Sequence, residues 1–110
     1  MQTDLMNEIT STYQKHGWEL KSVLLRRESL KDLPNEIYAA TGNKKAREAA
    51  IDALWFSRPS HNKGEAWELR LLAETPYALF QRFEADEPKE KRAQAMKEME
   101  ERMTQYVAGG

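Results

Sequence analysis

The chain contains no cysteine, which excludes disulfide bonds, thiolate nucleophiles and cysteine-ligated metal centres. It also has no apolar run that approaches the roughly 18 residues of a membrane-spanning helix. The first residues, Met1 to Asp4, are acidic and then amphipathic, unlike a signal peptide. We therefore expect a cytoplasmic protein with no membrane partner.

Motifs for known chemistries are equally scarce. The two histidines are His16, at a predicted helix end, and His61, in a predicted turn, and they lack the four-residue spacing of a helical zinc site. There is no Gly-x-Ser-x-Gly nucleophile motif, and Gly42 to Lys45 lacks the spacing of a phosphate-binding loop. We assign no catalytic residue, no metal ligand and no cofactor. A non-enzymatic function is favoured, although an enzyme stays open.

Charge and size narrow the class of protein further. Seventeen basic residues oppose eighteen acidic ones, so the net charge of -1 argues against a general affinity for nucleic acid. A chain of 110 residues, 40% hydrophobic, has room for one domain with one core. We expect a single domain over residues 1–107 and a frayed tail over 108–110.

Two long helices are predicted, one near each end of the chain. Apolar residues recur at spacings of three and four over residues 3–16, and Gly17 suits the left-handed position that follows a helix. Residues 86–88, Asp-Glu-Pro, are typical of a helix start. The methionine-rich stripe beyond them predicts a helix that ends at about Tyr106.

Alternating apolar and polar residues predict four strands. The first covers residues 18–27, where the triplet Val23-Leu24-Leu25 breaks the alternation and indicates a bulge or burial on both faces. The other three form a meander over residues 51–58, 65–73 and 77–84. Thr75-Pro76 is also a good helix start, so a helix over 76–85 is the alternative to the last strand.

The segment between the first strand and the meander is less regular. Pro34 begins a predicted short helix that extends through Ala40, after a loop. The alanine-rich residues 44–50 predict another short helix, which could continue through Leu54. The fold class that follows is α+β: a two-layer sandwich with the order α-β-α-β-β-β-α, a four-stranded antiparallel sheet, and the N- and C-terminal helices packed on one face.

Turns at residues 59–64 and 74–76 predict the register of the meander. Phe56 then lies opposite Trp67, and an apolar face faces the helices. The other face is mixed in character, since it carries aromatic, apolar and charged side chains, and such faces are typical of interfaces. Its predicted interface residues are Trp55, Glu68, Arg70, Leu72, Phe80 and Arg82. A shift of one residue in a turn would exchange the two faces.

The mixed face leads to our first hypothesis, a protein-interaction domain that self-associates as a homodimer through the open sheet face. The alternative is that residues 28–50 fold over that face and bury it. Single-stranded RNA binding by an arginine stripe with aromatic platforms is also conceivable. We do not favour it, because acidic residues share the predicted face.

A second hypothesis is a small-ligand pocket, or the site of a minor enzyme, between the sheet and residues 28–50. Its lining residues would be Tyr38, Arg58, His61 and Glu68. An enclosed cavity with charged walls would support it.

The last four residues, Val107 to Gly110, offer a third hypothesis. They resemble the double-glycine ends of ubiquitin-like and sulfur-carrier proteins, and also the cleavage site of double-glycine leader peptides. The resemblance implies a carrier or leader-type protein. The order of helices and strands does not match a ubiquitin-like fold, so we favour a frayed tail.

Overall fold

A computed structural model describes residues 3–31 and 46–109 of the chain. These residues form an α+β fold with three helices and one five-stranded mixed sheet. The elements are α1 (Thr3–Lys15), β1 (Glu19–Leu25), α2 (Arg27–Lys31), β2 (Ala46–Glu48), β3 (Ala53–Pro59), a 3-10 turn (His61–Lys63), β4 (Glu65–Leu71), β5 (Ala78–Phe83) and α4 (Lys89–Gly109). The predicted short helix from Pro34 to Ala40 lies outside the described residues.

The sheet has the strand order β2-β1-β3-β4-β5. The predicted meander is confirmed as β3, β4 and β5, and its last segment is a strand rather than the alternative helix. The helix predicted over residues 44–50 is wrong where the structure describes it, because β2 pairs there in parallel with β1. Pairing with a buried strand outweighs the helix propensity of a short alanine-rich segment. The sheet is therefore five-stranded and mixed, where we expected four antiparallel strands.

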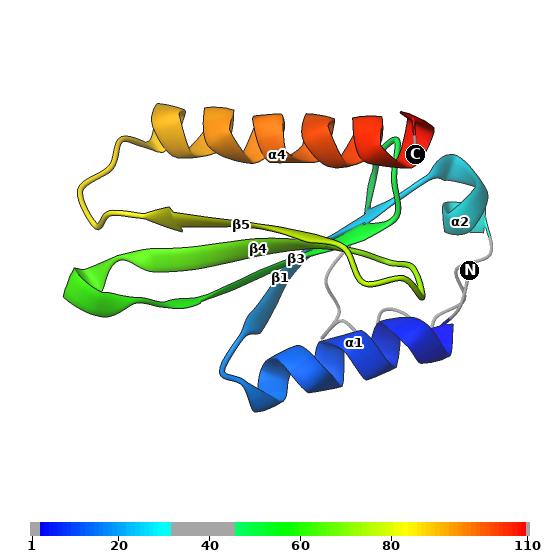
Figure 1. Ribbon diagram of the computed structural model, residues 1–110, viewed down its shortest axis with the longest axis horizontal. Helices are drawn as coiled ribbons and strands as arrows, with labels where there is room; N and C mark the ends of the chain where they lie inside the picture. Colours follow the sequence, from blue (N-terminus) through cyan, green and yellow to red (C-terminus); the bar gives the residue numbers. More distant parts are fainter. Residues whose placement is uncertain (1–2, 32–45, 110) are drawn as a thin grey trace.

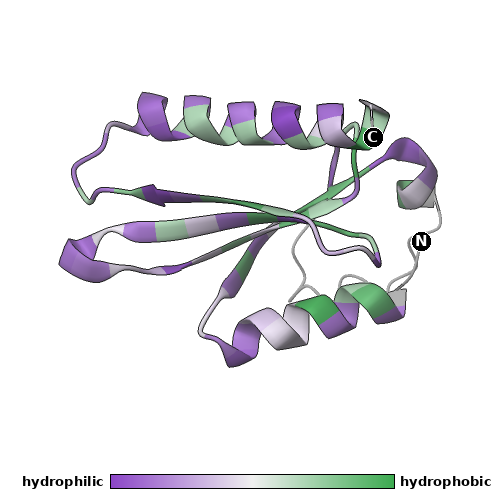
Figure 2. Cartoon of the chain, in the orientation of Figure 1, coloured by the Kyte–Doolittle hydropathy of each residue, from purple (hydrophilic) through white to green (hydrophobic). Residues whose placement is uncertain are grey.

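The two long helices lie on opposite faces of the sheet, α4 above it and α1 below it in Figure 1. The prediction of a two-layer sandwich with both helices on one face is therefore wrong. Each helix covers its own apolar cluster, and Figure 2 shows apolar residues concentrated where the strands cross between them. The buried cluster under α1 contains Met6, Ile9, Leu20, Val23, Leu25, Leu54 and Phe56. The cluster under α4 contains Leu24, Ile51, Ala53, Trp55, Leu69, Met99 and Met103.

Strand β3 shows why two covering helices are needed. All its residues from Ala53 to Ser57 are buried, so side chains that point to either face are removed from water. Residues Val23 to Leu25 of β1 are buried in the same way, and a register irregularity follows Leu20. Of the two alternatives predicted for Val23 to Leu25, burial on both faces is confirmed, whereas the register irregularity lies before the triplet, between Leu20 and Ser22. A sheet with apolar residues on both faces has to be covered on both.

The register between β3 and β4 differs from the prediction by one residue. Pro59 still pairs with Glu65, so the turn is shorter than residues 59–64 and Phe56 lies opposite Glu68 rather than Trp67. A shift of one residue reverses which face each side chain occupies. Consequently Trp55 belongs to the α4 side and Phe56 to the α1 side, the reverse of the predicted grouping with β4.

The register between β4 and β5 differs from the prediction by two residues. Glu68 lies opposite Phe80 and Arg70 opposite Ala78. The turn predicted at residues 74–76 would instead place Glu68 opposite Arg82 and Arg70 opposite Phe80. A shift of two residues keeps every side chain on its face. The predicted grouping within these two strands therefore holds.

The ends of the long helices are fixed by local contacts. After α1, Gly17 adopts a φ of 85°, and its N–H donates to the carbonyl of Gln14 at 3.1 Å, as expected for a helix C-terminus. Helix α4 continues to Gly109, three residues beyond the predicted end. Tyr106 stacks on Tyr77 with ring centroids 3.7 Å apart, which holds the last turns of α4 against the connection between β4 and β5.

Candidate interaction surface

Helix α1 covers only part of its side of the sheet. The cluster beneath it draws on β1 and β3, while on β4 and β5 the same side carries half-buried Glu68, Arg70 and Arg82 and exposed Phe80. Phe80 retains 58% of its accessible surface, more than any other large apolar side chain in the described part of the chain. Strand β5 is also an outer strand of the described sheet. An aromatic side chain is therefore presented to solvent at a strand edge.

A row of aromatic rings connects Phe80 to the core. Phe56 stacks on Tyr13 at 4.1 Å, Tyr13 meets the edge of Trp18 at 6.0 Å, and Trp18 meets Phe80 at 6.4 Å. The guanidinium carbon of Arg58 lies 4.6 Å from the centroid of the Trp18 ring, a favourable cation–π geometry. We call Trp18, Arg58, Phe80 and Arg82 the edge surface. The exposed ring of Phe80 is therefore packed against Trp18, which restricts its orientation.

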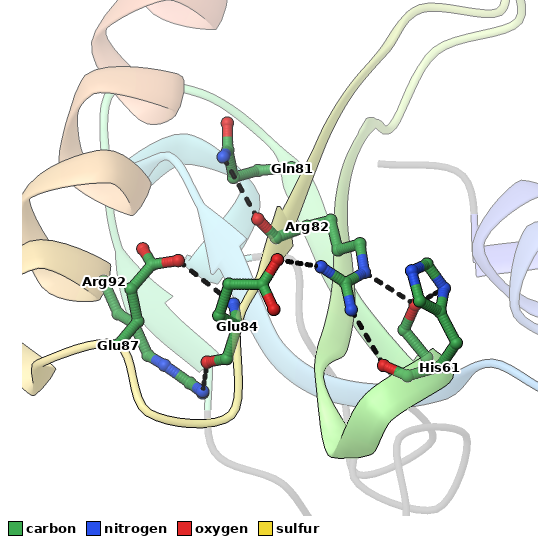
Figure 3. Close-up of polar contacts among 7 residues, drawn as sticks. His61, Gln81, Arg82, Glu84, Glu87 and Arg92 are labelled. Carbon is green, nitrogen blue, oxygen red and sulfur yellow. Dashed lines mark hydrogen bonds and ion pairs between the residues drawn. The ribbon is translucent and has the colours of Figure 1, made fainter.

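The arginines on this side of the sheet are bound to the chain itself. Arg58 donates to the carbonyl of His16 at 3.1 Å, and Arg70 donates to the carbonyl of Leu71. Arg82 donates to the Ser60 hydroxyl at 3.0 Å and to the His61 carbonyl at 2.8 Å, and it pairs with Glu84 (Figure 3). These contacts fix each guanidinium group in one orientation and satisfy part of its donor capacity.

Gly64 makes room for Arg82 at the β3–β4 turn. A methyl group there would lie 2.7 Å from both the Arg82 guanidinium and the Phe83 carbonyl, and the carbonyl belongs to a paired strand that cannot move away. We expect Gly64→Ala to lower the free energy of unfolding by about 1–3 kcal/mol through overpacking, measured by urea denaturation. Gly109→Ala is the matched control, because nothing lies within 4 Å of a methyl group at that position. Equal stability of the two variants would contradict the close approach.

Tyr13 and Glu68 form a polar pair at the margin of the α1 cluster. The Tyr13 hydroxyl donates to the Glu68 carboxylate. Burial raises the pKa of Tyr13 well above its ordinary value, and the hydrogen bond and negative charge of Glu68 raise it further, while Arg70 opposes them. The folded protein therefore retains the phenol proton more strongly than the unfolded chain does.

This difference predicts a loss of stability in alkali. The contribution of Tyr13 is complete below the unfolded-state pKa of about 10 and declines as the pH rises above it, because only the unfolded chain then releases the proton. We expect Tyr13→Phe to lose less stability than the wild type between about pH 8 and pH 11, measured by urea denaturation at each pH. Tyr106→Phe, at an exposed ring, should behave as the wild type does. Parallel pH dependences for the wild type and Tyr13→Phe would contradict the assignment.

The structure does not bring the six predicted interface residues together. Trp55 lies on the α4 side, is 1% exposed, and donates from its indole nitrogen to Glu100 at 2.9 Å. Its placement on the open face is therefore wrong, and the one-residue register shift is the cause. Leu72 is half-buried against the α1 cluster. Glu68, Arg70, Phe80 and Arg82 do share one side of the sheet, as predicted.

Two members of the edge surface were missed as interface candidates. Trp18 follows the turn after α1, and Arg58 was assigned to the ligand pocket instead. The useful signal was the alternation of β1 and β3, which in the observed register places Leu20 opposite Phe56 and so brings the start of β1 to the same side. Glu100, the partner of Trp55, also binds Arg47 at 2.7 Å and had no sequence signal beyond its place beside Met99.

The residues predicted for a ligand pocket are likewise not gathered. Arg58 and His61 are exposed near the β3–β4 turn. Glu68 accepts a hydrogen bond from Tyr13, at the margin of the α1 cluster. Tyr38 lies outside the described residues. A cleft of about 310 Å³ does lie between α1 and the β4–β5 connection, lined in part by Glu8, Tyr13, Arg70 and Glu74. The predicted pocket residues that the structure describes, Arg58, His61 and Glu68, do not line this cleft.

Comparisons with known protein families, curated proteins and solved structures find no significant match. In residues 3–31 and 46–109, no three histidine or carboxylate side chains gather in a way that could hold a metal ion. Among the helices that the structure describes, none combines the length and apolar character needed to cross a bilayer.

Proposed function

We propose that this protein is a non-enzymatic protein-interaction domain that binds a protein partner through the edge surface. The observation that carries the proposal is Phe80, which is 58% exposed, packed edge-on against Trp18, and located on an outer strand. Aromatic and arginine side chains held rigidly at a surface are the residues that most often dominate binding energy. Phe80 is only partly buried in the folded monomer. A partner that covers the ring therefore gains the free energy of burying its remaining apolar surface.

A protein partner suits this surface better than a nucleic acid. Phosphate binding requires excess positive charge. Arg82 is paired with Glu84, and Arg58 and Arg70 already use some of their N–H donors on carbonyl groups of the chain. Glu68 lies directly opposite Phe80 in the register and would repel a phosphate backbone. The edge surface therefore favours apolar and backbone contacts over charge.

The double-glycine hypothesis receives less support. A carrier tail has to enter its activating enzyme as an extended chain, whereas α4 is helical through Gly109. The edge surface, unlike the C-terminal residues, presents aromatic and arginine side chains that can bind a partner. We therefore assign the function to the edge surface.

The proposal is tested by site-specific photo-crosslinking in the native cells. Phe80 is replaced by the photoreactive analogue p-benzoylphenylalanine, and Tyr106, an aromatic residue that is also exposed, is replaced in a matched control. We expect the analogue at position 80 to give a discrete protein adduct, identified by mass spectrometry, and the analogue at position 106 to give none. The absence of any adduct at position 80, or the same adducts at both positions, would overturn the proposal.

A further inference from the structure

The outer edge of β5 has a free half and an occupied half. The carbonyl of Tyr77 accepts the N–H of Leu71 at 2.9 Å, so Tyr77 and every second residue after it direct their backbone groups toward β4. Ala78, Phe80 and Arg82 therefore direct theirs away from the sheet. No described residue hydrogen-bonds to the outward groups of Ala78 and Phe80.

Beyond Phe80 the edge is capped by side chains, as Figure 3 shows. The Gln81 amide donates to the Arg82 carbonyl at 3.2 Å, and Glu87 accepts the N–H of Glu84 at 3.0 Å. Arg92 donates to the Glu84 carbonyl at 2.8 Å. A strand added to this edge therefore finds unoccupied partners around Phe80, and finds occupied ones around Glu84.

We propose that the partner is a second copy of this chain, which adds its own β5 antiparallel to the first about a two-fold axis at Phe80. This inference rests on the proposed function and names the partner for the same surface. With Phe80 on the axis, each Phe80 N–H donates to the other copy's Phe80 carbonyl, and each Arg82 N–H donates to the other copy's Ala78 carbonyl. All four of these bonds use backbone groups to which no residue in the described ranges hydrogen-bonds.

The caps exclude the neighbouring register. An axis at Gln81 would pair Ala78 of each copy with Glu84 of the other, whose N–H is held by Glu87 and whose carbonyl is held by Arg92. Forming that register requires the Glu84 N–H of each copy to give up its hydrogen bond to Glu87, and the Glu84 carbonyl to be shared with Arg92. In the register centred on Phe80 no internal hydrogen bond has to break. The Arg82 carbonyl has two lone pairs, so it can accept both the Gln81 amide and the N–H of the other copy's Ala78.

Side chains agree with the register centred on Phe80. The two Phe80 rings become neighbours across the axis, each supported by its own Trp18, and aromatic pairs of this kind stabilise sheets. Ala78 lies beside the other copy's Arg82, and Leu79 beside its Gln81. None of these pairs brings two like charges together, so the side chains of β5 allow two copies of the strand to pair.

Solution mass is the first test. Sedimentation equilibrium on the full chain, at concentrations up to about 1 mM, should show a monomer–dimer equilibrium. Phe80→Ser should raise the dissociation constant at least tenfold, while Val107→Ser, at an apolar side chain that is 49% exposed, should leave it unchanged. Monomer at every concentration would overturn the self-pairing. If the photoreactive analogue at position 80 then captures a different protein, the proposed function stands without it; if it captures nothing, both fail.

The register is tested with single cysteines, which are unambiguous because the chain has none of its own. In the register centred on Phe80, Leu79 lies opposite the other copy's Gln81 at a Cα separation of about 4.5 Å, within the range of a disulfide. Oxidation of an equal mixture of Leu79→Cys and Gln81→Cys should therefore give the mixed dimer. Self-linked Gln81→Cys would instead place the axis at Gln81, and self-linked Leu79→Cys would place it at Leu79. Either result, or no cross-link, would overturn the register.

Discussion

Trp55→Ala is expected to lower the free energy of unfolding by about 3–5 kcal/mol, as other deletions of large buried aromatic side chains do. Trp55 is 1% exposed beneath α4, meets Trp67 edge-on at 6.0 Å, and donates its indole hydrogen to Glu100. The substitution leaves a cavity and also removes the donor that holds the Glu100 carboxylate. Because a domain of this size has a total stability of about 5–15 kcal/mol, the urea midpoint should fall markedly.

A matched control separates this effect from an effect on association. Phe80→Ser removes an aromatic ring that is mostly exposed, so the midpoint of the monomer should hardly change. If Trp55→Ala kept its full stability and only altered the solution mass, Trp55 would belong to an interface and the observed register of β3 would be wrong.

Phe56→Ala should be nearly as costly, at about 3–5 kcal/mol, although Phe56 points to the opposite face. Its side chain is fully buried and stacks on Tyr13 at 4.1 Å, so its loss empties the centre of the α1 cluster. Circular dichroism and tryptophan fluorescence during urea denaturation should show one coincident transition, since both clusters share β3. A stable α4 cluster that survives the loss of the α1 cluster, visible as two separate transitions, would contradict that coupling.

Much of the fold was predictable because local chemistry determines it. The period of α1, the left-handed position of Gly17 and the meander all follow from residues close to one another in the chain. The wrong predictions concern how segments that are distant in the chain pair with one another. Residues Ala53 to Ser57 offer apolar or small side chains to both faces, so alternation alone could not say which face Trp55 takes. The additional pair between Pro59 and Glu65 sets the register and so determines which face Trp55 occupies.

The candidate site was predictable to the same extent. Phe80, Arg70 and Arg82 were selected correctly as members of one side of the sheet, because a two-residue shift between β4 and β5 leaves faces unchanged. Trp18 and Arg58 were not grouped with them, since their proximity depends on the pairing of β1 with β3, and these two strands are separated by more than 25 residues in the chain. Strand β2 was missed because three residues are too few to show a period.

The two outer strands of the described sheet have a further consequence, for resistance to fibre formation. Strand β2 is three residues long, and its Arg47 and Glu48 are engaged in ion pairs with Glu100 and Arg27. Strand β5 is closed by side chains over its last residues. Cross-β growth needs long, bare edges on both sides of every copy. In the described part of the sheet, the longer free stretch of edge is the first half of β5, and the proposed two-fold pairing would close it, which leaves only the three-residue edge of β2 for further growth.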